Sequence, residues 1–327
     1  MRAKLWIRNN QNLANIKALS KLSSARDIAI SNNAVLGTLE GLDNLTCVLK
    51  SLEIFQNPSL SSIAALGKLS SVERVEIVNN AALSSLEGLE GLTRVVQLSI
   101  GGDSGFTNLK ELNNLETVDL RIGIGGAQLT SLEGLDKLSS IGPSGILSIS
   151  SPLLTSLVPL KTLSGEVGNL GIGFNARLTD LEGLDNISAI NQQLSIVENA
   201  RLASLDALAN ITGDVPNLVI QGNGSLVVLH GLHNISFTSN TLEITDNSSL
   251  ESLDGLSNIT SIGGNLSIKR NAQLNELAGP AKLESIGGDL IIENNPNLPG
   301  TEITILLDQL NAKGGIGGTT NILGNLE

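Results

Sequence analysis

The chain has 327 residues and a formal net charge of −12, which argues against nucleic acid or an anionic membrane as its partner. The single cysteine, Cys47, excludes an intrachain disulfide, and no apolar run approaches the roughly 20 residues of a transmembrane helix. Hydrophobic residues make up 41% of the chain and aromatic residues only 2%, so we expect a folded protein with an aliphatic core.

A pair of apolar residues separated by one other residue recurs along the chain with a period close to 24 residues. The pairs begin at Leu5, Ile28, Leu52, Val75, Leu98, Ile122, Leu147, Leu170, Leu194, Leu218, Leu242, Leu266 and Leu290. A period of roughly 20–50 residues indicates a stack of supersecondary units, each of which buries its apolar side against its neighbours. The pattern predicts an all-β dominated repeat, a parallel β-solenoid of about 13 coils of about 24 residues.

The unit that begins at Leu242 shows which elements to expect within one coil. Leu242-Glu243-Ile244 alternates with period two, as a half-buried strand does. The apolar spacing then changes to three residues from Leu250 to Ile259, before a turn at Gly263-Gly264. This spacing fits a 3₁₀-like turn or short strand segments, because the stretch is too short and too rich in glycine for a stable helix in every coil.

The two ends of the chain differ. Met1-Arg2-Ala3-Lys4 leads directly into the first apolar pair, with neither a signal peptide nor a capping element. Because a solenoid needs polar caps, we interpret the chain as a fragment that begins inside a longer stack. At the other end, four apolar residues after Pro299-Gly300 follow helical spacing and predict a short capping helix, followed by a last strand near Ile322. These four residues are Ile303, Leu306, Leu307 and Leu310. The predicted organisation is a repeat solenoid over residues 1–298 and a C-terminal cap over residues 299–327.

An asparagine stands five residues after most strand starts. These residues are Asn10, Asn33, Asn57, Asn80, Asn175, Asn199, Asn223, Asn247, Asn271 and Asn295. An inward-turning chain leaves backbone groups without strand partners, and stacked amide side chains can satisfy those groups and one another. We therefore predict a structural asparagine ladder, in which Asp103 replaces one rung and Ala127 and Pro152 interrupt the series.

The residues expected to point outward from the strands form a candidate binding face. Near the ends of the chain they are varied, as at Trp6, Arg8 and Lys269, whereas in the middle they are all small. The small ones are Ser99, Gly101, Gly123, Gly125, Ser148, Ser150, Gly171 and Gly173. Such a smooth surface can bind a flat partner or a second copy of the solenoid. The alternative explanation for the small residues is sequence drift in a central segment that tolerates substitution.

Catalytic and metal-binding chemistry has little support in the sequence. His230 and His233 are the only histidines and would form an incomplete zinc site, so we predict no metal and no cofactor. Acidic pairs recur at one phase of the repeat, at Glu40/Asp43, Glu87/Glu90, Glu133/Asp136 and Glu182/Asp185. A solvated face explains them, and a weak site for a cation or a basic partner is the alternative. No catalytic triad can be assembled, and we expect a protein that is not an enzyme.

The string LxIxxNxxLxxLxGLxNLxxIGG over residues 242–264 resembles a leucine-rich repeat, in particular the receptor L-domain-like type of microbial surface proteins. The resemblance extends from Leu5 to about Leu298 and implies a right-handed solenoid with a role in recognition outside the cell or at its surface. The cysteine-rich modules that flank L domains of growth-factor receptors are absent, so no ligand-binding residues are carried over.

Three functions are compatible with this sequence. The first is non-enzymatic binding of a protein or glycan at a cell surface through the strand face. The second is a structural or adhesive surface module that associates with itself through the small residues. The third is an intracellular leucine-rich-repeat adaptor, which the lone cysteine and the lack of a signal peptide favour.

Overall fold

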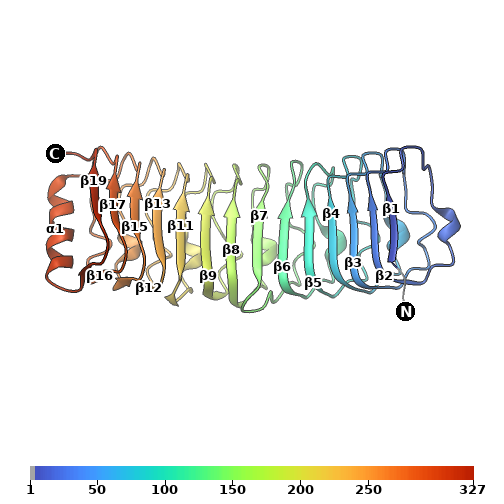
Figure 1. Ribbon diagram of the computed structural model, residues 1–327, viewed down its shortest axis with the longest axis horizontal. Coiled ribbons are helices and arrows are strands. Elements are labelled where there is room, and N and C mark those ends of the chain that lie inside the picture. Colours follow the sequence, from blue (N-terminus) through green and yellow to red (C-terminus); the bar gives the residue numbers. More distant parts are fainter. Residues whose placement is uncertain (1–3) are drawn as a thin grey trace. The chain divides into compact units, whose positions relative to one another are not determined.

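The computed structural model describes residues 4–327. The chain divides into two compact units, Met1–Leu163 (unit 1) and Ser164–Glu327 (unit 2). Each unit is a right-handed parallel β-solenoid with coils of about 24 residues, which confirms the predicted fold class (Figure 1). The division falls within the repeat, and the boundary expected after Leu298 stays a prediction.

Unit 1 contains one sheet of parallel strands that pair in chain order. The strands are β1 (Lys4–Arg8), β2 (Ser24–Ser31), β3 (Cys47–Phe55), β4 (Ser71–Val78), β5 (Arg94–Gly101), β6 (Thr117–Gly125) and β7 (Ile146–Ser150). Short 3₁₀ turns stand between some of them, namely η1 (Lys17–Leu19), η2 (Ala64–Leu66), η3 (Lys110–Leu112) and η4 (Val158–Leu160).

Unit 2 contains two parallel sheets on different sides of its coils. The first consists of β8 (Gly165–Gly173), β9 (Ile187–Val197), β11 (Asn217–Gln221), β13 (Thr241–Thr245), β15 (Leu266–Lys269), β17 (Leu290–Glu293) and β19 (Thr320–Leu323). The second consists of β10 (Gly213–Asp214), β12 (Ile235–Thr238), β14 (Ser261–Ile262), β16 (Ser285–Ile286) and β18 (Gly315–Ile316). The 3₁₀ turns are η5 (Asp206–Leu208) and η6 (Asp254–Leu256). The 3₁₀ turns and the short strand segments that we expected from the three-residue apolar spacing therefore both occur.

The core of each unit is a stack of aliphatic side chains, one layer per coil. In the coil that begins with β3, Leu52 and Ile54 point inward from the strand, and Leu60, Leu66 and Leu69 follow at three-residue multiples; all five are fully buried. Each residue pairs with its counterpart one coil later, as Leu52 does with Val75, so identical positions stack along the unit. The period-two and period-three patterns therefore describe one continuous inner surface.

All thirteen predicted strand starts lie in parallel strands. Thirteen starts enclose twelve complete turns, and about 12 turns are present where we expected about 13 coils. The predicted C-terminal helix is also confirmed as α1 (Gly300–Asn311). Its buried face consists of Ile303, Leu306 and Leu310. Gln309 Nε2 donates to the carbonyl oxygens of Pro280 and Leu283, at 3.1 and 2.6 Å, so the helix is fastened to the preceding coil.

Candidate functional site

The strand face of unit 1 consists of the outward-pointing residues of β1 to β7, which parallel pairing holds in two rows. The first row is Trp6, Ala29, Glu53, Glu76, Ser99, Gly123 and Ser148. The second row is Arg8, Ser31, Phe55, Val78 and Gly101, with Gly125 and Ser150 on the last two strands. Aromatic and charged side chains on the first strands therefore give way to small ones on β5 to β7.

The first strands present a fixed cluster of charged and aromatic groups. Trp6 is 60% exposed, and the cations of Lys4 and Arg8 lie 5.3 and 5.1 Å from its ring centroid, within cation–π range. Arg8 also reaches across β2 to Glu53 at 3.6 Å. Arg8 can reach Glu53 because Ala29, which lies between Trp6 and Glu53 in the first row, has a small side chain.

The small residues of unit 1 form a less uniform surface than the sequence predicts. Ser99, Gly123, Ser148 and Ser150 are half-buried, as is Gly125. Gly101, however, is buried, which corrects its assignment to the exposed face. Its φ of +152° turns it against β6, where the carbonyl oxygen of Gly125 occupies the place of a Cβ atom.

Gly125 is itself crowded, and this changes which residue tests the surface. A Cβ atom at Gly125 would lie 2.9 Å from the carbonyl oxygen of Ser150, closer than real contacts allow. At Gly123 the nearest atoms lie 3.9 Å away. A large side chain at Gly125 would therefore disturb the backbone, whereas Gly123 accepts a side chain that points into solvent.

The strand face of unit 2 also has two rows. The first is Gly171, Ser195, Val219, Glu243, Ser267, Ile291 and Asn321, and the second is Gly173, Val197, Gln221, Thr245, Lys269, Glu293 and Leu323. Gly171 and Gly173, the last of the predicted small residues, are half-buried on β8. Charged groups follow on the later strands, where Lys269 and Glu293 form an ion pair at 3.7 Å.

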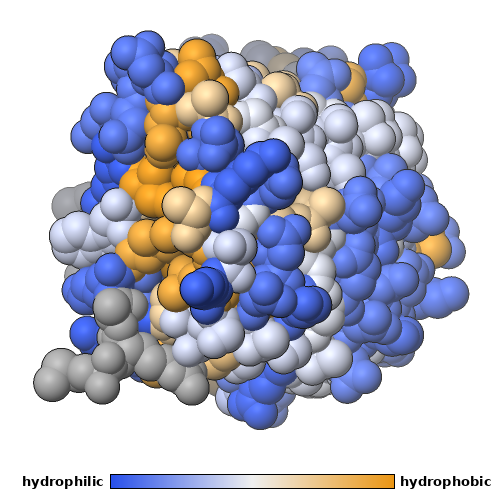
Figure 2. Space-filling model, turned by 90° about the vertical axis from the view of Figure 1, so that its right-hand side faces the viewer, coloured by the Kyte–Doolittle hydropathy of each residue, from blue (hydrophilic) through white to orange (hydrophobic). Residues whose placement is uncertain are grey.

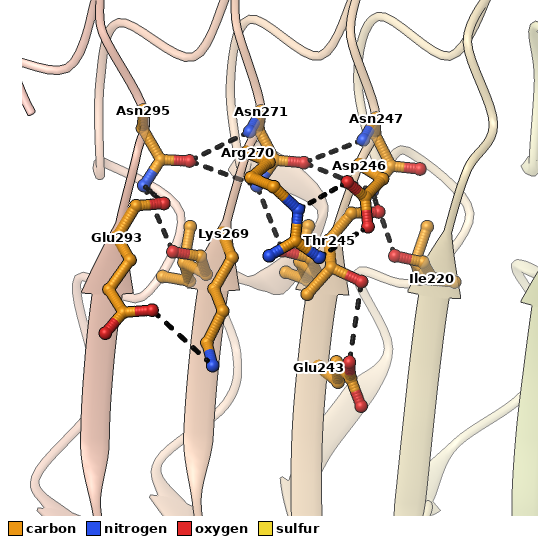
Figure 3. Close-up of polar contacts among 12 residues, drawn as sticks. Ile220, Glu243, Thr245, Asp246, Asn247, Lys269, Arg270, Asn271, Glu293 and Asn295 are labelled. Atoms are coloured by element: carbon orange, nitrogen blue, oxygen red, sulfur yellow. Dashed lines mark hydrogen bonds and ion pairs between the residues drawn. The ribbon is translucent and has the colours of Figure 1, made fainter. Parts of the chain in front are cut away.

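Asparagines form a hydrogen-bonded ladder at the corner that follows each strand of the first sheet of unit 2, and Figure 3 shows the rungs Asn247, Asn271 and Asn295. The Oδ1 atom of Asn271 accepts hydrogen bonds from the backbone N and from Nδ2 of Asn247, at 3.1 and 3.2 Å. Asn247 Nδ2 also donates to the carbonyl oxygens of Ile220 and Thr245, at 2.9 and 3.0 Å. One side chain thus contacts backbone groups of its own coil and of the coil before it, and it also bonds to the side chain of the next rung. Buried backbone groups at such a corner need hydrogen-bond partners of this kind.

Most of the predicted ladder residues occupy equivalent places. Asn33, Asn57, Asn80, Asn175, Asn199, Asn223, Asn247, Asn271 and Asn295 have no exposed surface. Asn10 is exposed, but its backbone N and Nδ2 donate to Asn33 Oδ1 at 3.2 and 3.0 Å. Wherever two asparagines of the ladder are bonded, Oδ1 of the later one accepts from the coil before it, so the ladder has a direction along the chain.

The residue before each asparagine forces the chain around the corner. Most of these residues have left-handed backbones although they are not glycines, with φ of 60° at Asp246 and 53° at Arg270. Before Asn223 this place is taken by Gly222, with φ of 68°. Such a conformation is unfavourable for an L-residue, and the ladder hydrogen bonds hold it in place. It also brings the side chains of successive corners together, as Arg270 and Asp246 form two hydrogen bonds of 2.6 and 2.7 Å.

The predicted ladder was wrong at two coils of unit 1. Asp103 is exposed, and the neighbouring Ser104 takes its place, with Oγ accepting from the backbone N of Asn80 at 3.4 Å. Ser151, next to Pro152, also provides a rung, since its Oγ lies 2.9 and 2.7 Å from the carbonyl oxygens of Gly126 and Leu129. Local insertions and deletions shift the phase by one residue in these coils. Ala127 is exposed and supplies no rung, as expected.

The sequence reading also missed a rung at the C-terminus. Asn325 Oδ1 accepts from the backbone N and Nδ2 of Asn295, at 3.1 and 3.0 Å. The signal was present, because Asn325 stands five residues after Thr320, which pairs with Leu290. It was overlooked because Thr320 is not apolar.

The acidic pairs have a structural role that the sequence did not suggest. The second carboxylate of each pair accepts a hydrogen bond from the backbone N of a glycine two residues before it, as Asp43 does from Gly41 at 2.8 Å and Asp185 does from Gly183 at 2.8 Å. Glu90 and Asp136 repeat the contact at 2.9 and 3.1 Å. These acids therefore close turns on the surface.

The two histidines and the cysteine lie apart from any cluster of ligands. His230 and His233 are exposed, and His233 Nε2 lies 3.3 Å from Asn234 Nδ2. Cys47 is half-buried at the start of β3. Within residues 4–327, no group of three or more His, Cys, Asp or Glu side chains could hold a metal ion.

Two carboxylates of unit 2 have shifted acidities with a local cause. The hydrogen bonds from the Arg270 guanidinium hold the pKa of Asp246 below its ordinary value. Hydrogen bonds from the backbone and hydroxyl of Thr319 likewise lower the pKa of Asp289. Both groups therefore stay ionised as fixed surface anions at neutral pH.

No protein-family model matches this chain, and no curated protein is significantly similar to it. None of the helices in the described part of the chain is long and apolar enough to span a membrane. The geometry of the two strand faces is therefore the basis for a functional proposal.

Proposed function

We propose that the protein is a non-enzymatic binding scaffold that acts at a cell surface, outside the cell, and recognises a protein or a glycan through its strand faces. The leucine-rich-repeat pattern of the receptor L-domain-like type is the source of this idea. The observation that carries it is the register of the strands, which presents two straight rows of side chains at a regular spacing on each unit.

Rigidity makes these rows suitable for recognition. Parallel strands lie about 4.8 Å apart, so each row presents one side chain per such step without any loop to order on binding. The rows combine aromatic and charged groups with short residues. In unit 1 these are the exposed Trp6 and the half-buried Phe55 and Glu76, beside the short Ser99. A ligand that fits the rows loses little conformational entropy from the protein side, which favours affinity.

A matched pair of glycine substitutions tests the proposal. Gly123→Arg places a large cation on the strand face of unit 1, and Gly37→Arg places the same side chain in the connection after β2, where nothing lies within 4 Å of the new Cβ atom. The labelled wild-type protein is screened against arrays of surface glycans and extracellular proteins. We expect ligands whose binding Gly123→Arg reduces by about tenfold or more while Gly37→Arg does not. Equal binding by both variants would exclude the strand face of unit 1 as the site, and Ser195→Arg applies the same test to unit 2.

Self-association is the second candidate, and the half-buried small residues on β5 to β7 favour it. Two such flat surfaces can approach closely, because Ser99, Gly123 and Ser148 project little from the sheet. Light scattering coupled to size-exclusion chromatography over a concentration series distinguishes the two functions. A concentration-dependent oligomer that Gly123→Arg disperses supports an adhesive module, and a monomer at all concentrations leaves the face free for another ligand.

A further inference from the structure

One acidic residue of unit 1 is buried, against the general arrangement of the coil. Apolar side chains lie inside the coils and charged ones outside, and the view of unit 1 from its β1 end shows an apolar band with hydrophilic residues on both sides of it (Figure 2). Glu111, in η3, departs from this arrangement because it is only 8% exposed. A buried carboxylate is costly unless hydrogen bonds or a cation compensate its charge.

The repeat does not account for a glutamate at this place. The position stands two residues after the buried leucine or isoleucine of the turn, as Glu111 does after Leu109. Elsewhere it holds only glycine, alanine or proline, namely at Ala18, Gly41, Ala65, Gly88, Gly134, Pro159, Gly183, Ala207, Gly231, Gly255 and Gly279. Coils approach closely here, since a Cβ atom at Gly88 would lie 2.6 Å from the carbonyl oxygen of Ile63. Packing between coils therefore favours a small residue.

The Glu111 carboxylate has an incomplete set of partners. Its Oε1 atom accepts a hydrogen bond of 2.8 Å from Ser85 Oγ, which belongs to the coil before it. Within residues 4–327, Oε2 accepts no hydrogen bond and the carboxylate forms no ion pair. An ionised carboxylate can accept about four hydrogen bonds. A buried negative charge is therefore left with a single neutral donor.

The hydrogen bond from Ser85 does not explain the glutamate either. Ser85 Oγ accepts from the backbone N of Glu87 at 3.0 Å and so closes the turn of its own coil. Ser131 and Ser204 close equivalent turns with hydrogen bonds of 3.0 Å, and within the described part of the chain their hydroxyls donate to no carboxylate. The turn thus forms with or without a carboxylate as its partner.

Glu111 lines an open hollow of about 530 Å³ between its coil and the coil before it, which we call the Glu111 hollow. The other lining residues are Ser85, Glu87, Glu90, Lys110 and Asn113. Three acidic residues and one basic residue give the hollow a formal net charge of −2. Glu90 is held in place because it accepts from the backbone N of Gly88 at 2.9 Å. Glu87 and Lys110 are exposed and form no ion pair within residues 4–327.

The hollow is suited to an organic cation rather than to a metal ion. Its carboxylates do not converge, since no group of three or more His, Cys, Asp or Glu side chains among the described residues could hold a metal. A guanidinium group offers five N–H donors that point in several directions. It is also more weakly hydrated than an ammonium group, so it loses less on leaving water for a site beside a buried carboxylate.

We propose that the Glu111 hollow binds the guanidinium group of an arginine side chain on a partner protein. One N–H group donates to Glu111 Oε2 and another donates to the carboxylate of Glu87. Lys110 has the same charge as the ligand and weakens its binding. The hollow lies in the connections after β4 and β5, so this contact is separate from the strand faces and does not depend on what they bind.

Short peptides with a single arginine test the proposal. The probe is acetyl-Gly-Ser-Arg-Ser-Gly-amide, and two matched peptides carry lysine or the uncharged isostere citrulline in place of the arginine. Amide resonances of the isotopically labelled protein report binding at Gly88, and the equivalent turn glycine of unit 2, Gly183, is the internal control. We expect saturable shifts at Gly88 only, with a dissociation constant below about 10 mM. The lysine and citrulline peptides should bind about fivefold or more weakly.

Variants of the protein identify the groups that bind. Glu111→Gln keeps the shape of the side chain but removes its charge, and should weaken binding about tenfold. The matched control Glu182→Gln removes an exposed acid of unit 2 at the position equivalent to Glu87, and should bind as the wild type does. Lys110→Gln should strengthen binding about twofold or more. Gly123→Arg, which tests the strand face, should leave peptide binding unchanged, so the two proposals can fail separately.

Glu111→Ala separates binding from folding. It should unfold at a urea concentration no lower than the wild type, because Ala65 and Ala207 occupy the same position, and it should not bind the arginine peptide. A lower urea midpoint would mean that the fold accounts for Glu111 and would remove the basis of the proposal.

Other outcomes would overturn the proposal directly. Equal binding of the lysine or citrulline peptide would exclude guanidinium recognition. Equal weakening by Glu182→Gln would assign the effect to net charge alone. Absence of a saturable shift at Gly88 with the arginine peptide at up to about 10 mM would show that the hollow does not take this group.

Discussion

The two units have the same coil but hold its corner in different ways. Unit 2 has an unbroken series of asparagine rungs from Asn175 to Asn325. Unit 1 begins in the same way but continues with Ser104, then a corner without a side-chain rung, then Ser151. Pairing register and core layers persist through both. The aliphatic layers therefore set the coil, and the ladder satisfies the backbone that the coil leaves at its corner.

The difference in hydrogen bonding is one of capacity. An asparagine side chain offers two N–H donors and a carbonyl acceptor, whereas a serine offers one donor and its lone pairs. Asn247 connects three coils, whereas Ser151 Oγ lies within hydrogen-bond distance of the carbonyl oxygens of Gly126 and Leu129. After β5 and β6 glycines let the backbones approach closely, as Gly101 does against the carbonyl oxygen of Gly125.

Both units should respond equally to a change at a position that fixes the coil spacing. Gly134 and Gly231 have φ of +108° and +87°, and a Cβ atom at either would overlap the carbonyl oxygen of Leu109 or Leu205 in the preceding coil. Gly134→Ala and Gly231→Ala should each lower the free energy of unfolding by about 3 kcal/mol or more, from overpacking and left-handed strain together. Urea unfolding measures this, with Gly123→Ala as a control that should change stability by less than about 0.5 kcal/mol. A large effect in only one unit would mean that the coil spacing is not shared.

The ladder itself should matter most in unit 2. Asn247→Ala removes the Nδ2 donor to the carbonyl of Ile220 and the Oδ1 acceptor of the backbone N of Asn223, and should cost about 1–3 kcal/mol. Asn240→Ala, at an exposed position, is the control and should be close to neutral. An unchanged melting temperature for Asn247→Ala would contradict a structural role for the ladder.

Ser151→Ala removes a serine rung of unit 1, and its effect on stability can be compared with that of Asn247→Ala in unit 2. A hydroxyl offers one O–H donor where an amide offers two N–H donors, so we expect a cost of about 1 kcal/mol, smaller than that of Asn247→Ala. Parallel urea denaturation of the two variants gives the ratio. If Ser151→Ala proved the more damaging change, hydrogen-bonding capacity would not explain how the units differ.

The smallest effect concerns the ion pair at the outside of the unit 2 corner. The pKa of Asp246 is depressed by Arg270, so the pair stabilises the folded state above the ordinary pKa of an aspartate and loses this contribution as the pH falls through the depressed value. Both groups are substantially exposed, so screening limits the contribution to about 0.2–1 kcal/mol. Asp246→Asn should therefore be slightly less stable at pH 7, and the difference should shrink as the pH falls below the ordinary pKa of an aspartate. A stability difference that persisted at low pH would assign the effect to packing.

The repeat pattern was sufficient to predict the fold and most of the ladder. Pairs of apolar residues with period two predicted every strand from β1 to β17 in the sheet of unit 1 and in the first sheet of unit 2. The helical spacing after Gly300 predicted α1. Both predictions succeed because burial imposes these periods directly. The phase of the corner cannot be read where the chain gains or loses a residue, so the sequence predicts a rung at Asp103 instead of Ser104 and an interruption at Pro152 instead of a rung at Ser151. The burial of Gly101 was also out of reach, because it depends on how the backbone of β6 approaches β5. The function of the acidic pairs was missed since a carboxylate that caps a turn has no periodic signature of its own.

The direction of the asparagine ladder has a consequence for how the protein is made. Each coil carries donors whose acceptor lies on the next coil to be synthesised, and each new coil delivers that acceptor. During translation, a growing chain can therefore complete one coil after another, with unmet donors only at the most recent one. The sequence separation of these contacts remains about 24 residues however long the stack becomes, so loop closure at each step has a constant entropic cost. A ladder of opposite direction would leave every nascent coil with an idle acceptor instead, which is less costly to bury than an unpaired N–H group.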